Sequence, residues 1–155
     1  MRNLYMHSLQ IEIKQLTSVP GFELPRYQSD GASGMDLRAC VKEAITLAPG
    51  RVAGETCGIA IAVPTGYKAQ VRPRSGLTLN QQVTVLNTPG TVDSDYRGEI
   101  TVILANLGVS PFVITPGMRI AQLVVAPVVR VDWVQAESLP RTVRSVGGFG
   151  STGTE

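Results

Sequence analysis

"GIAIAVPTGYKAQVRP", residues 58–73, carries the clearest structural pattern in the chain. Apolar residues recur at every second position on both sides of a Pro-Thr-Gly sequence: Ile59, Ile61 and Val63 before it, and Tyr67, Ala69 and Val71 after it. Such alternation is typical of a strand, because successive side chains point to opposite faces. The proline and glycine at 64 and 66 favour a tight turn. The stretch therefore predicts a β-hairpin with one polar face.

Short apolar runs of the same kind continue outward in both directions. They cover residues 9–16, 34–41, 44–50, 82–87, 99–107, 111–115, 119–131 and 131–135. Pro-Gly pairs, which suit tight turns, stand at 20/21, 49/50, 89/90 and 116/117. No apolar stripe of helical period is longer than about two turns, so we expect little helix. The predicted class is all-β, as a sandwich, jelly roll or barrel.

Size and charge limit the broad class of protein. With 155 residues, of which 43% are hydrophobic, the chain suits one domain with a substantial core. The net charge is only +2 and no basic stripe stands out, which argues against nucleic acid as a ligand. The N-terminal sequence resembles no signal peptide and no segment is long enough to span a bilayer. We expect no membrane partner and a soluble, cytoplasmic protein.

Cysteine and histidine are too scarce for several kinds of site. Cys40 and Cys57 lack C-x-x-C spacing, so we expect two small core residues, although the sequence does not decide whether they form a disulfide. His7 is the only histidine. A Ser-His-Asp triad, a Cys-His pair and a histidine-rich metal site are therefore hard to build.

Two polar stretches have the composition of phosphate-binding loops. "RPRSGLT", residues 72–78, joins arginine forks, a serine hydroxyl and a glycine, although a solvated turn would look the same. "VGGFGSTG", residues 146–153, can turn several backbone N–H groups toward one anion, but it lacks the lysine and helix of a Walker A motif. Residues 141–155 have little apolar content, so a mobile tail is the alternative.

Charged residues crowd into "NTPGTVDSDYRGEI", residues 87–100, although only 17% of the chain is charged. A carboxylate such as Asp93 or Asp95, held near a phosphate, can orient and deprotonate water, and Mg²⁺ would offset the repulsion between the two. The alternative is a polar turn with a surface ion pair to Arg97. Taken by itself, the stretch leaves both interpretations open.

Together and in this order, five stretches resemble the five motifs of the homotrimeric dUTP diphosphatases, the dUTPases. They are "ASGMDLRA" (32–39), "RPRSGLT" (72–78), "NTPGTVDSDYRGEI" (87–100), "PGMRIAQLVVAPV" (116–128) and "RSVGGFGSTG" (144–153). The resemblance covers nearly the whole chain after residue 10. Two details depart from the common pattern: no glycine follows Arg144, and Thr78 stands where alanine is frequent. Neither departure removes a functional group.

The resemblance implies a fold and a reaction. The fold is a jelly-roll-like β-sandwich or barrel that forms a homotrimer with shared active sites. Residues 1–143 would form the β-rich domain, and residues 144–155 a flexible tail that closes over the nucleotide. The enzyme would hydrolyse dUTP to dUMP and pyrophosphate with Mg²⁺, which lowers dUTP and supplies dUMP for thymidylate synthesis.

The resemblance also implies roles for single residues around the nucleoside. Asp93 would activate the water that attacks the α-phosphorus. Tyr96 would pack against deoxyribose and exclude a 2′-hydroxyl, since a close apolar wall rejects an added oxygen. Asn87 would read the uracil edge with one donor and one acceptor. Backbone groups around the uracil would come from Gly90, Thr91, Val92 and Thr101.

The remaining implied residues would bind the phosphates, stack on the base, or lie in the outer coordination sphere of the metal. The phosphate ligands would be Arg74, Ser75, Gly76, Gln122, Arg144, Gly150, Ser151 and Thr152. Phe149 would stack over uracil. Asp36 would reach the outer sphere of Mg²⁺, which substrate phosphates and water would otherwise hold.

Two other functions stay open on sequence alone. The trimeric dCTP deaminases share the fold, but their deamination glutamate stands in a different arrangement, and "VDSDYRGEI" follows the diphosphatase version. A non-catalytic trimer that binds dUTP is the second alternative. Pyrophosphate release from dUTP, or ammonia release from dCTP, would distinguish these functions.

Overall fold

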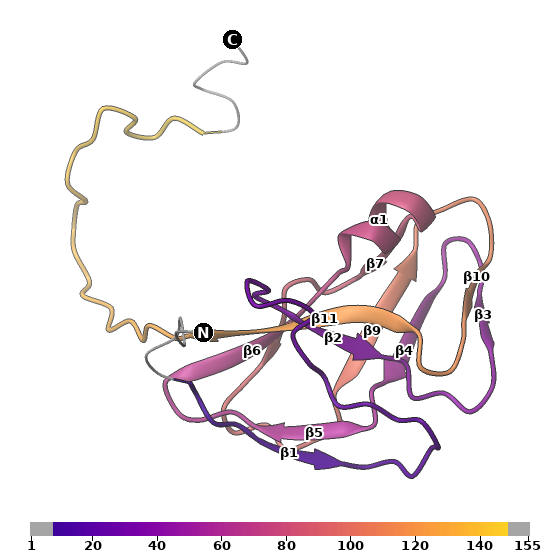
Figure 1. Ribbon diagram of the computed structural model, residues 1–155. Coiled ribbons are helices and arrows are strands. Elements are labelled where there is room, and N and C mark those ends of the chain that lie inside the picture. The colour runs from indigo at the N-terminus through magenta and orange to yellow at the C-terminus, as the bar shows by residue number, and fades with distance from the viewer. Residues whose placement is uncertain (1–7, 149–155) are drawn as a thin grey trace.

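The computed structural model describes residues 8–148, and these form eleven strands and one short helix (Figure 1). The strands are β1 (Glu12–Gln15), β2 (Met35–Arg38), β3 (Ile45–Leu47), β4 (Val52–Thr56), β5 (Ile59–Ala62), β6 (Tyr67–Arg72), β7 (Val83–Val85), β8 (Gly90–Val92), β9 (Thr101–Asn106), β10 (Phe112–Ile114) and β11 (Arg119–Pro127). The helix α1 covers Ser75–Gln81. The expected all-β class is therefore confirmed.

The strands pair into small antiparallel sheets instead of one continuous sheet. Their orders are β1-β5, β10-β3, β2-β11-β6-β8 and β4-β9-β7. In the largest sheet, β11 pairs with β6 along six residues, from Gln122 opposite Arg72 to Pro127 opposite Tyr67. β8 is an edge strand of this sheet, because within residues 8–148 it pairs only with β6.

The predicted hairpin over residues 58–73 is wrong, although its turn is present. The Tyr67 amide donates to the Pro64 carbonyl at 3.1 Å, and Gly66 has a φ of +90°. The strands then diverge: β5 pairs with β1, and β6 lies between β11 and β8. The residues of β5 from Ile59 to Ile61 are all buried, so this strand has no polar face. Each of the two strands therefore pairs with strands that are distant from it in the sequence, and β5 and β6 do not pair with each other.

Other local expectations also differ from the structure. β4, β8 and α1 were not predicted, and the strand expected over 131–135 does not form in this chain. The Pro-Gly pairs at 20/21, 49/50 and 116/117 do form turns with a positive φ at glycine. At 89/90 the pair instead follows a cis bond between Thr88 and Pro89, and Gly90 begins β8.

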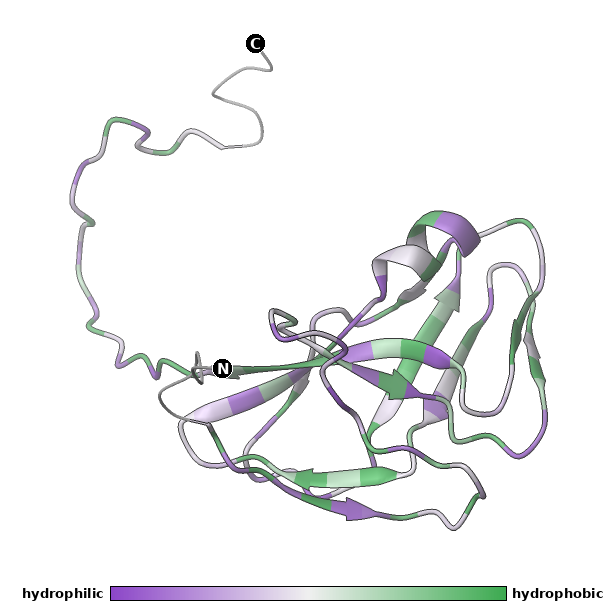
Figure 2. Ribbon diagram, viewed as in Figure 1, coloured by the Kyte–Doolittle hydropathy of each residue, from purple (hydrophilic) through white to green (hydrophobic). Residues whose placement is uncertain are grey.

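One hydrophobic core lies between the sheets. Its largest fully buried apolar side chains are Leu37, Ile59, Ile100, Leu104, Ile114 and Ile120. They come from β2, β5, β9, β10 and β11, with Ile100 just before β9, so every sheet contributes to the same core. Figure 2 shows the hydrophobic residues recurring along β5 and β9. Cys57 belongs to this core as expected, Cys40 is half-buried, and both thiols are free.

The chain leaves this body after β11. Residues 128–146 are all exposed and contain no strand, and Figure 1 shows them leading away from the sheets. Apolar side chains lie along the segment, including Val129, Trp133 and Val134, each close to nine-tenths exposed. Among residues 8–148, no helix is long and apolar enough to cross a membrane.

Candidate active site

A small cavity beside the edge strand β8 gathers many of the predicted residues. Its volume is about 160 Å³. We call it the β8 cavity, and it is lined by Val71, Asn87, Gly90, Thr91, Val92, Asp93, Tyr96, Glu99, Ile100 and Thr101. β8 forms one side and the start of β9 the other, so two backbone segments face each other without a strand between them.

Asn87 lies at this cavity with its amide over the backbone of β8. A Cβ added at Gly90 would lie 3.0 Å from the Asn87 Nδ2, so any other residue there would push the amide aside by a few tenths of an ångström. Within the described part of the chain, no hydrogen bond occupies this amide. Its donor and its acceptor are therefore both available to a ligand.

The carboxylate of Asp93 is exposed at the same cavity and has no partner among residues 8–148. The ion pair to Arg97 that a plain polar turn would contain does not form. Arg97 instead donates to the backbone carbonyls of Ser94, at 2.7 Å, and Tyr96, at 2.8 Å. Arg97 thus shapes the loop and leaves Asp93 open.

Tyr96 is bent back onto its own loop. Its hydroxyl donates to the Glu99 carbonyl at 3.0 Å, and its amide donates to the Asp93 carbonyl at 3.2 Å. The side chain of Glu99 in turn accepts the Gly58 N–H at 2.9 Å. The loop that carries Asp93 and Tyr96 is therefore attached to the start of β5.

A second group of polar residues, the arginine cluster, consists of Asp36, Arg74 and Arg119. Arg74 Nε donates to Asp36 Oδ1 at 2.9 Å, and Arg119 donates to Asp36 Oδ2 at 3.2 Å. The side chain of Asp36 is only 14% exposed, which favours these charge-assisted bonds. Two guanidinium groups around one carboxylate leave a net positive charge, which suits an anion such as a phosphate.

Gln122 and Ser75 lie next to the arginine cluster. Gln122 on β11 stands opposite Asp36 on β2, and its amide donates to the Pro73 carbonyl at 2.9 Å. Arg74 directly precedes α1, and Ser75 and Gly76 form its exposed first turn. The segment 73–76 therefore links the end of β6 to the arginine cluster.

Thr78 binds this helix to the next strand. Its hydroxyl donates to the Arg74 carbonyl at 3.3 Å and to the Val83 carbonyl at 3.2 Å. The threonine that departs from the common motif therefore contributes contacts that an alanine would not make.

The two groups do not share the β8 cavity. The β8 cavity is lined by none of Asp36, Arg74, Ser75 or Gln122. Among residues 8–148, the side chain of Arg144 bonds only within its own turn, where its Nε donates to the Gly147 carbonyl at 2.9 Å. Phe149, Gly150, Ser151 and Thr152 lie outside the described residues, as does His7.

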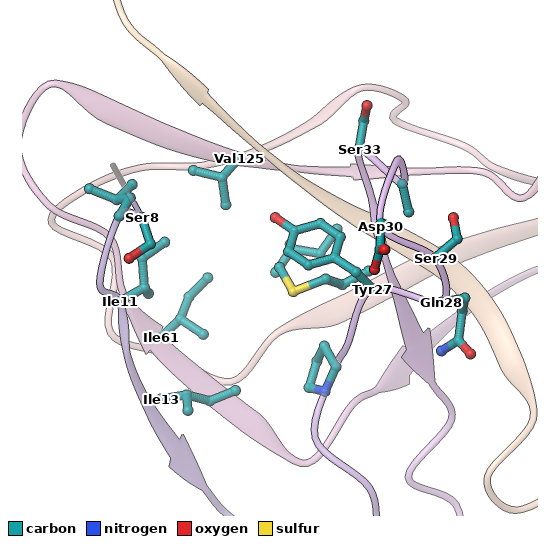
Figure 3. Close-up of a pocket in the computed structure, with 15 residues that line it drawn as sticks. Ser8, Ile11, Ile13, Tyr27, Gln28, Ser29, Asp30, Ser33, Ile61 and Val125 are labelled. Atoms are coloured by element: carbon teal, nitrogen blue, oxygen red, sulfur yellow. The ribbon is translucent and has the colours of Figure 1, made fainter. Parts of the chain in front are cut away.

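A larger hollow of about 890 Å³ lies elsewhere, between β1 and the loop before β2. Figure 3 shows Ile11, Ile13, Ile61 and Val125 on one side of it and Tyr27 on the other. None of the predicted site residues lines it. Both apolar and polar side chains line the larger hollow, and the sequence assigns a role to none of them.

The described carboxylates do not make a metal cage. Among residues 8–148, no three His, Cys, Asp or Glu side chains form a group that could hold a metal ion. Both Asp36 oxygens already accept from arginines. The assignment of Asp36 to the outer sphere of a metal stays a prediction.

Comparison with known proteins identifies the family. The family model described as dUTPase matches residues 21–153. The chain belongs to the dUTPase family. The deoxyuridine 5'-triphosphate nucleotidohydrolase of Rhizobium johnstonii is 52% identical over 145 residues, which are 92% of this chain and 93% of the relative. The enzyme of the same name from Chlamydia pneumoniae is 58% identical over 134 residues, which are 86% and 92% of the two chains.

Solved dUTPase structures share the fold. A mutant dUTPase of Staphylococcus bacteriophage 80alpha with dUpNHpp matches with a TM-score of 0.83 and 21% identity, over 94% of this chain and 99% of that one. A mutant dUTPase from phage phi11 of S. aureus, described with a structural Mg(II) ion, matches with a TM-score of 0.74 and 18% identity, over 84% and 98% of the two chains. The expected dUTPase-type fold is confirmed.

Two residues of the site were missed by sequence reasoning. Glu99 and Arg119 both lie within stretches that carry the dUTPase motifs, yet neither received a role. Nothing local marks them, because their partners are 41 and 83 residues away in sequence. Only the pairing of distant strands shows what each side chain contacts.

Proposed function

We propose that the protein hydrolyses dUTP to dUMP and pyrophosphate, which removes dUTP and supplies dUMP for thymidylate synthesis. The observation that carries this proposal is the β8 cavity, where an amide and a carboxylate with no partner among residues 8–148 lie together with a tyrosine ring. These are the groups needed to read a base, to activate water and to select a sugar. The membership of the chain in the dUTPase family supports the same reaction.

The uracil base is proposed to lie between β8 and the start of β9. β8 has one paired edge and one free edge, so its N–H and C=O groups on the free side can bind a flat polar ring. The Asn87 amide offers a donor and an acceptor to the imide edge. Cytosine would reverse part of this pattern, and each misplaced donor or acceptor costs about 1 to 3 kcal/mol.

The carboxylate of Asp93 is proposed to take a proton from the attacking water. The water oxygen then forms a bond to the α-phosphorus, and the bond from that phosphorus to the bridging oxygen of the β-phosphate breaks. Pyrophosphate leaves and dUMP remains. Within residues 8–148 the carboxylate of Asp93 has no ion pair or hydrogen bond, and this open position supports its role as a base.

The arginine cluster and the segment 73–76 are proposed to hold the phosphates. Asp36 holds the guanidinium of Arg74 through Nε, and the Arg119 carbonyl accepts from its Nη1 at 3.2 Å, which leaves Nη2 for phosphate oxygens. Ser75, Gly76 and Gln122 add polar contacts, and Arg144 with Gly150, Ser151 and Thr152 would add more from the C-terminal segment. Phe149 would cover the base.

Mg²⁺ is proposed as the cofactor. The described carboxylates fit an ion held mainly by substrate phosphates and water, because Mg²⁺ usually keeps several waters and binds few protein groups. When bound, it offsets the charge that would otherwise repel Asp93 from the triphosphate.

A homotrimer with shared sites is proposed as the working form. Two properties of the single chain support it: the arginine cluster does not line the β8 cavity, and the apolar side chains of residues 128–134 are exposed. The larger hollow adds an open surface with apolar side chains such as Ile11, Ile13 and Val125. A second and third copy would cover these surfaces and complete each site.

Pyrophosphate release from dUTP, dTTP, dCTP and UTP, with Mg²⁺ and with a chelator, tests the proposal. We expect turnover of dUTP alone and its loss with chelator. Equal turnover of all four would indicate a general nucleotide hydrolase. Ammonia release from dCTP would indicate a deaminase, and binding of dUTP without turnover a non-catalytic protein.

A further inference from the structure

Tyr96 reaches its position only because residue 98 has no side chain. A Cβ added at Gly98 would lie 2.6 Å from Tyr96 Cζ and 3.0 Å from Cε2, and closer still to the hydroxyl oxygen. Carbon atoms that are not bonded to each other pack at about 3.5 to 4.0 Å, so any other residue at 98 would move the ring. The ring thus lies directly against the backbone of its own loop.

The atom that receives the Tyr96 hydroxyl is itself held in place. This atom is the Glu99 carbonyl oxygen, which accepts the hydroxyl at 3.0 Å. The carboxylate of Glu99 accepts the Gly58 N–H at 2.9 Å, and the next residue, Ile100, donates its amide to the Ile59 carbonyl at 2.8 Å. Side-chain and backbone bonds therefore fix residues 99 and 100 to the start of β5.

Gly58 provides a rigid attachment point. It has a φ of +68°, which L side chains rarely adopt, and an added Cβ would lie 2.8 Å from a carbon of Thr17 and 2.9 Å from the Cys40 sulfur. The N–H that Glu99 binds therefore belongs to a tightly packed position. Through this hydrogen bond, Glu99 attaches the loop of Tyr96 to a rigid position at the edge of the core.

We propose that Gly98 and Glu99 are positioning residues for Tyr96 and thereby set how strictly the site rejects ribonucleotides. The inference rests on the proposed function, in which Tyr96 packs against the sugar. Steric rejection of a 2′-hydroxyl requires a rigid side chain beside the sugar, because a mobile ring would move aside. Tyr96 and Glu99 both line the β8 cavity, so a shift of either changes the space beside the sugar.

The test compares kcat/KM for dUTP and for UTP in the wild type and in five variants. Gly98→Ala moves the ring, Glu99→Ala removes the bond to Gly58, and Tyr96→Phe removes the hydroxyl. Glu99→Gln keeps an acceptor oxygen and is the conservative rescue. Gly31→Ala is the matched control, because a Cβ there meets no atom within 4 Å.

We expect the preference for dUTP over UTP to fall about 10-fold or more in Gly98→Ala and Glu99→Ala, and to fall in Tyr96→Phe. Glu99→Gln and Gly31→Ala should keep the wild-type preference. A preference that is unchanged in Gly98→Ala and Glu99→Ala would overturn the proposal. Equal losses for both substrates would also overturn it, since they would indicate support of the fold alone.

A second measurement does not depend on turnover. In protein with ¹³C-labelled tyrosine rings, Tyr96→Phe identifies the Tyr96 resonances, which should shift in Gly98→Ala and Glu99→Ala but not in Glu99→Gln. Unshifted resonances in the first two variants would contradict the positioning role. Absence of pyrophosphate release from dUTP by the wild type would refute the proposed function instead, and the resonances would still test the inference.

Discussion

At the scale of single residues, Asp93 and Glu55 are carboxylates in opposite surroundings. Asp93 is exposed beside the β8 cavity, and its carboxylate has no partner within residues 8–148. Glu55 is only 5% exposed, on β4, and within that part of the chain it has no ion pair or hydrogen bond to its carboxylate either. The exposed carboxylate of Asp93 suits chemistry, whereas the buried carboxylate of Glu55 affects the stability of the fold.

Asp93→Asn should lower the turnover of dUTP by about 100-fold or more, because the amide cannot accept the proton of the attacking water. Fold and nucleotide affinity should persist, since the change is isosteric and breaks no contact. Steady-state kinetics with a parallel measurement of dUTP binding checks both parts. Asp95→Asn, an exposed neighbour in the same loop, is the control and should keep its turnover. Normal turnover in Asp93→Asn would refute the role of Asp93.

Burial raises the pKa of Glu55 above its ordinary value. The folded protein therefore holds this proton more tightly than the unfolded chain does. Its contribution to stability is full below the ordinary pKa and is lost as pH rises through the raised pKa. Glu55→Gln should remove this loss, so the variant should exceed the wild type in stability at high pH and match it in acid.

Urea unfolding of both proteins from about pH 4 to pH 8 measures this effect. Glu43→Gln is the control, because Glu43 is exposed and the replacement should leave the pH dependence unchanged. If the stabilities of the wild type and of Glu55→Gln change in parallel with pH, Glu55 is not protonated preferentially in the folded protein.

At the scale of elements, Asn106 joins two sheets. It is fully buried at the end of β9, and its amide donates to the carbonyls of Leu47 and Ser110, each at 2.9 Å. Its Oδ1 accepts the Gly108 N–H at 2.9 Å. These bonds hold the β10-β3 pair against β9.

Asn106→Ala should destabilise the protein by about 2 to 4 kcal/mol, because it leaves several buried backbone groups without partners. Asn106→Asp keeps the acceptor for Gly108 but turns a buried carboxylate oxygen toward the carbonyls of Leu47 and Ser110. It should therefore destabilise the protein at least as much as Asn106→Ala, and chemical denaturation measures both losses. A loss below about 0.5 kcal/mol in Asn106→Ala would show that water replaces the side chain.

The sequence predicts strands well where apolar alternation is clear, and predicts their partners poorly. β9 and β11 lie within predicted runs, whereas β4 contains Gly54 and β8 is only three residues long inside a polar stretch. α1 has too few residues to show a helical period. The hairpin over 58–73 is wrong because β11 and β8 occupy the two edges of β6, which leaves no edge for β5.

The candidate site shows the same difference between what a local pattern predicts and what depends on distant partners. The gathering of Asn87, Asp93 and Tyr96 follows from one continuous motif, and the structure brings them to one cavity. The pairing of Asp36 with Arg74 joins residues 38 positions apart, and no local pattern indicates it. Contacts within a motif were accessible to sequence reasoning, and contacts between motifs required the fold.

At the scale of the whole molecule, the proposed site residues of a single chain do not all line the β8 cavity. Neither the arginine cluster nor Arg144 lines it. Val131, Trp133 and Val134 in the predicted strand at 131–135 are exposed, and no strand forms there. Both features have the same explanation if each site draws its residues from different copies.

Mixing two inactive variants tests this explanation directly. Asp93→Asn lacks the proposed base and Arg74→Gln lacks a proposed phosphate ligand, so each alone should be nearly inactive. If Asp93 and Arg74 of one site come from different copies, trimers formed at random from equal amounts should regain about a quarter of wild-type turnover, because half of the copies supply each native residue. The proteins would be unfolded together in urea and refolded, with trimer formation checked by sedimentation. A mixture of Asp93→Asn with the double variant should stay inactive, because no copy in it carries Asp93. Recovery confined to the first mixture would place the two residues of a site on different copies, and no recovery in either would place both on one.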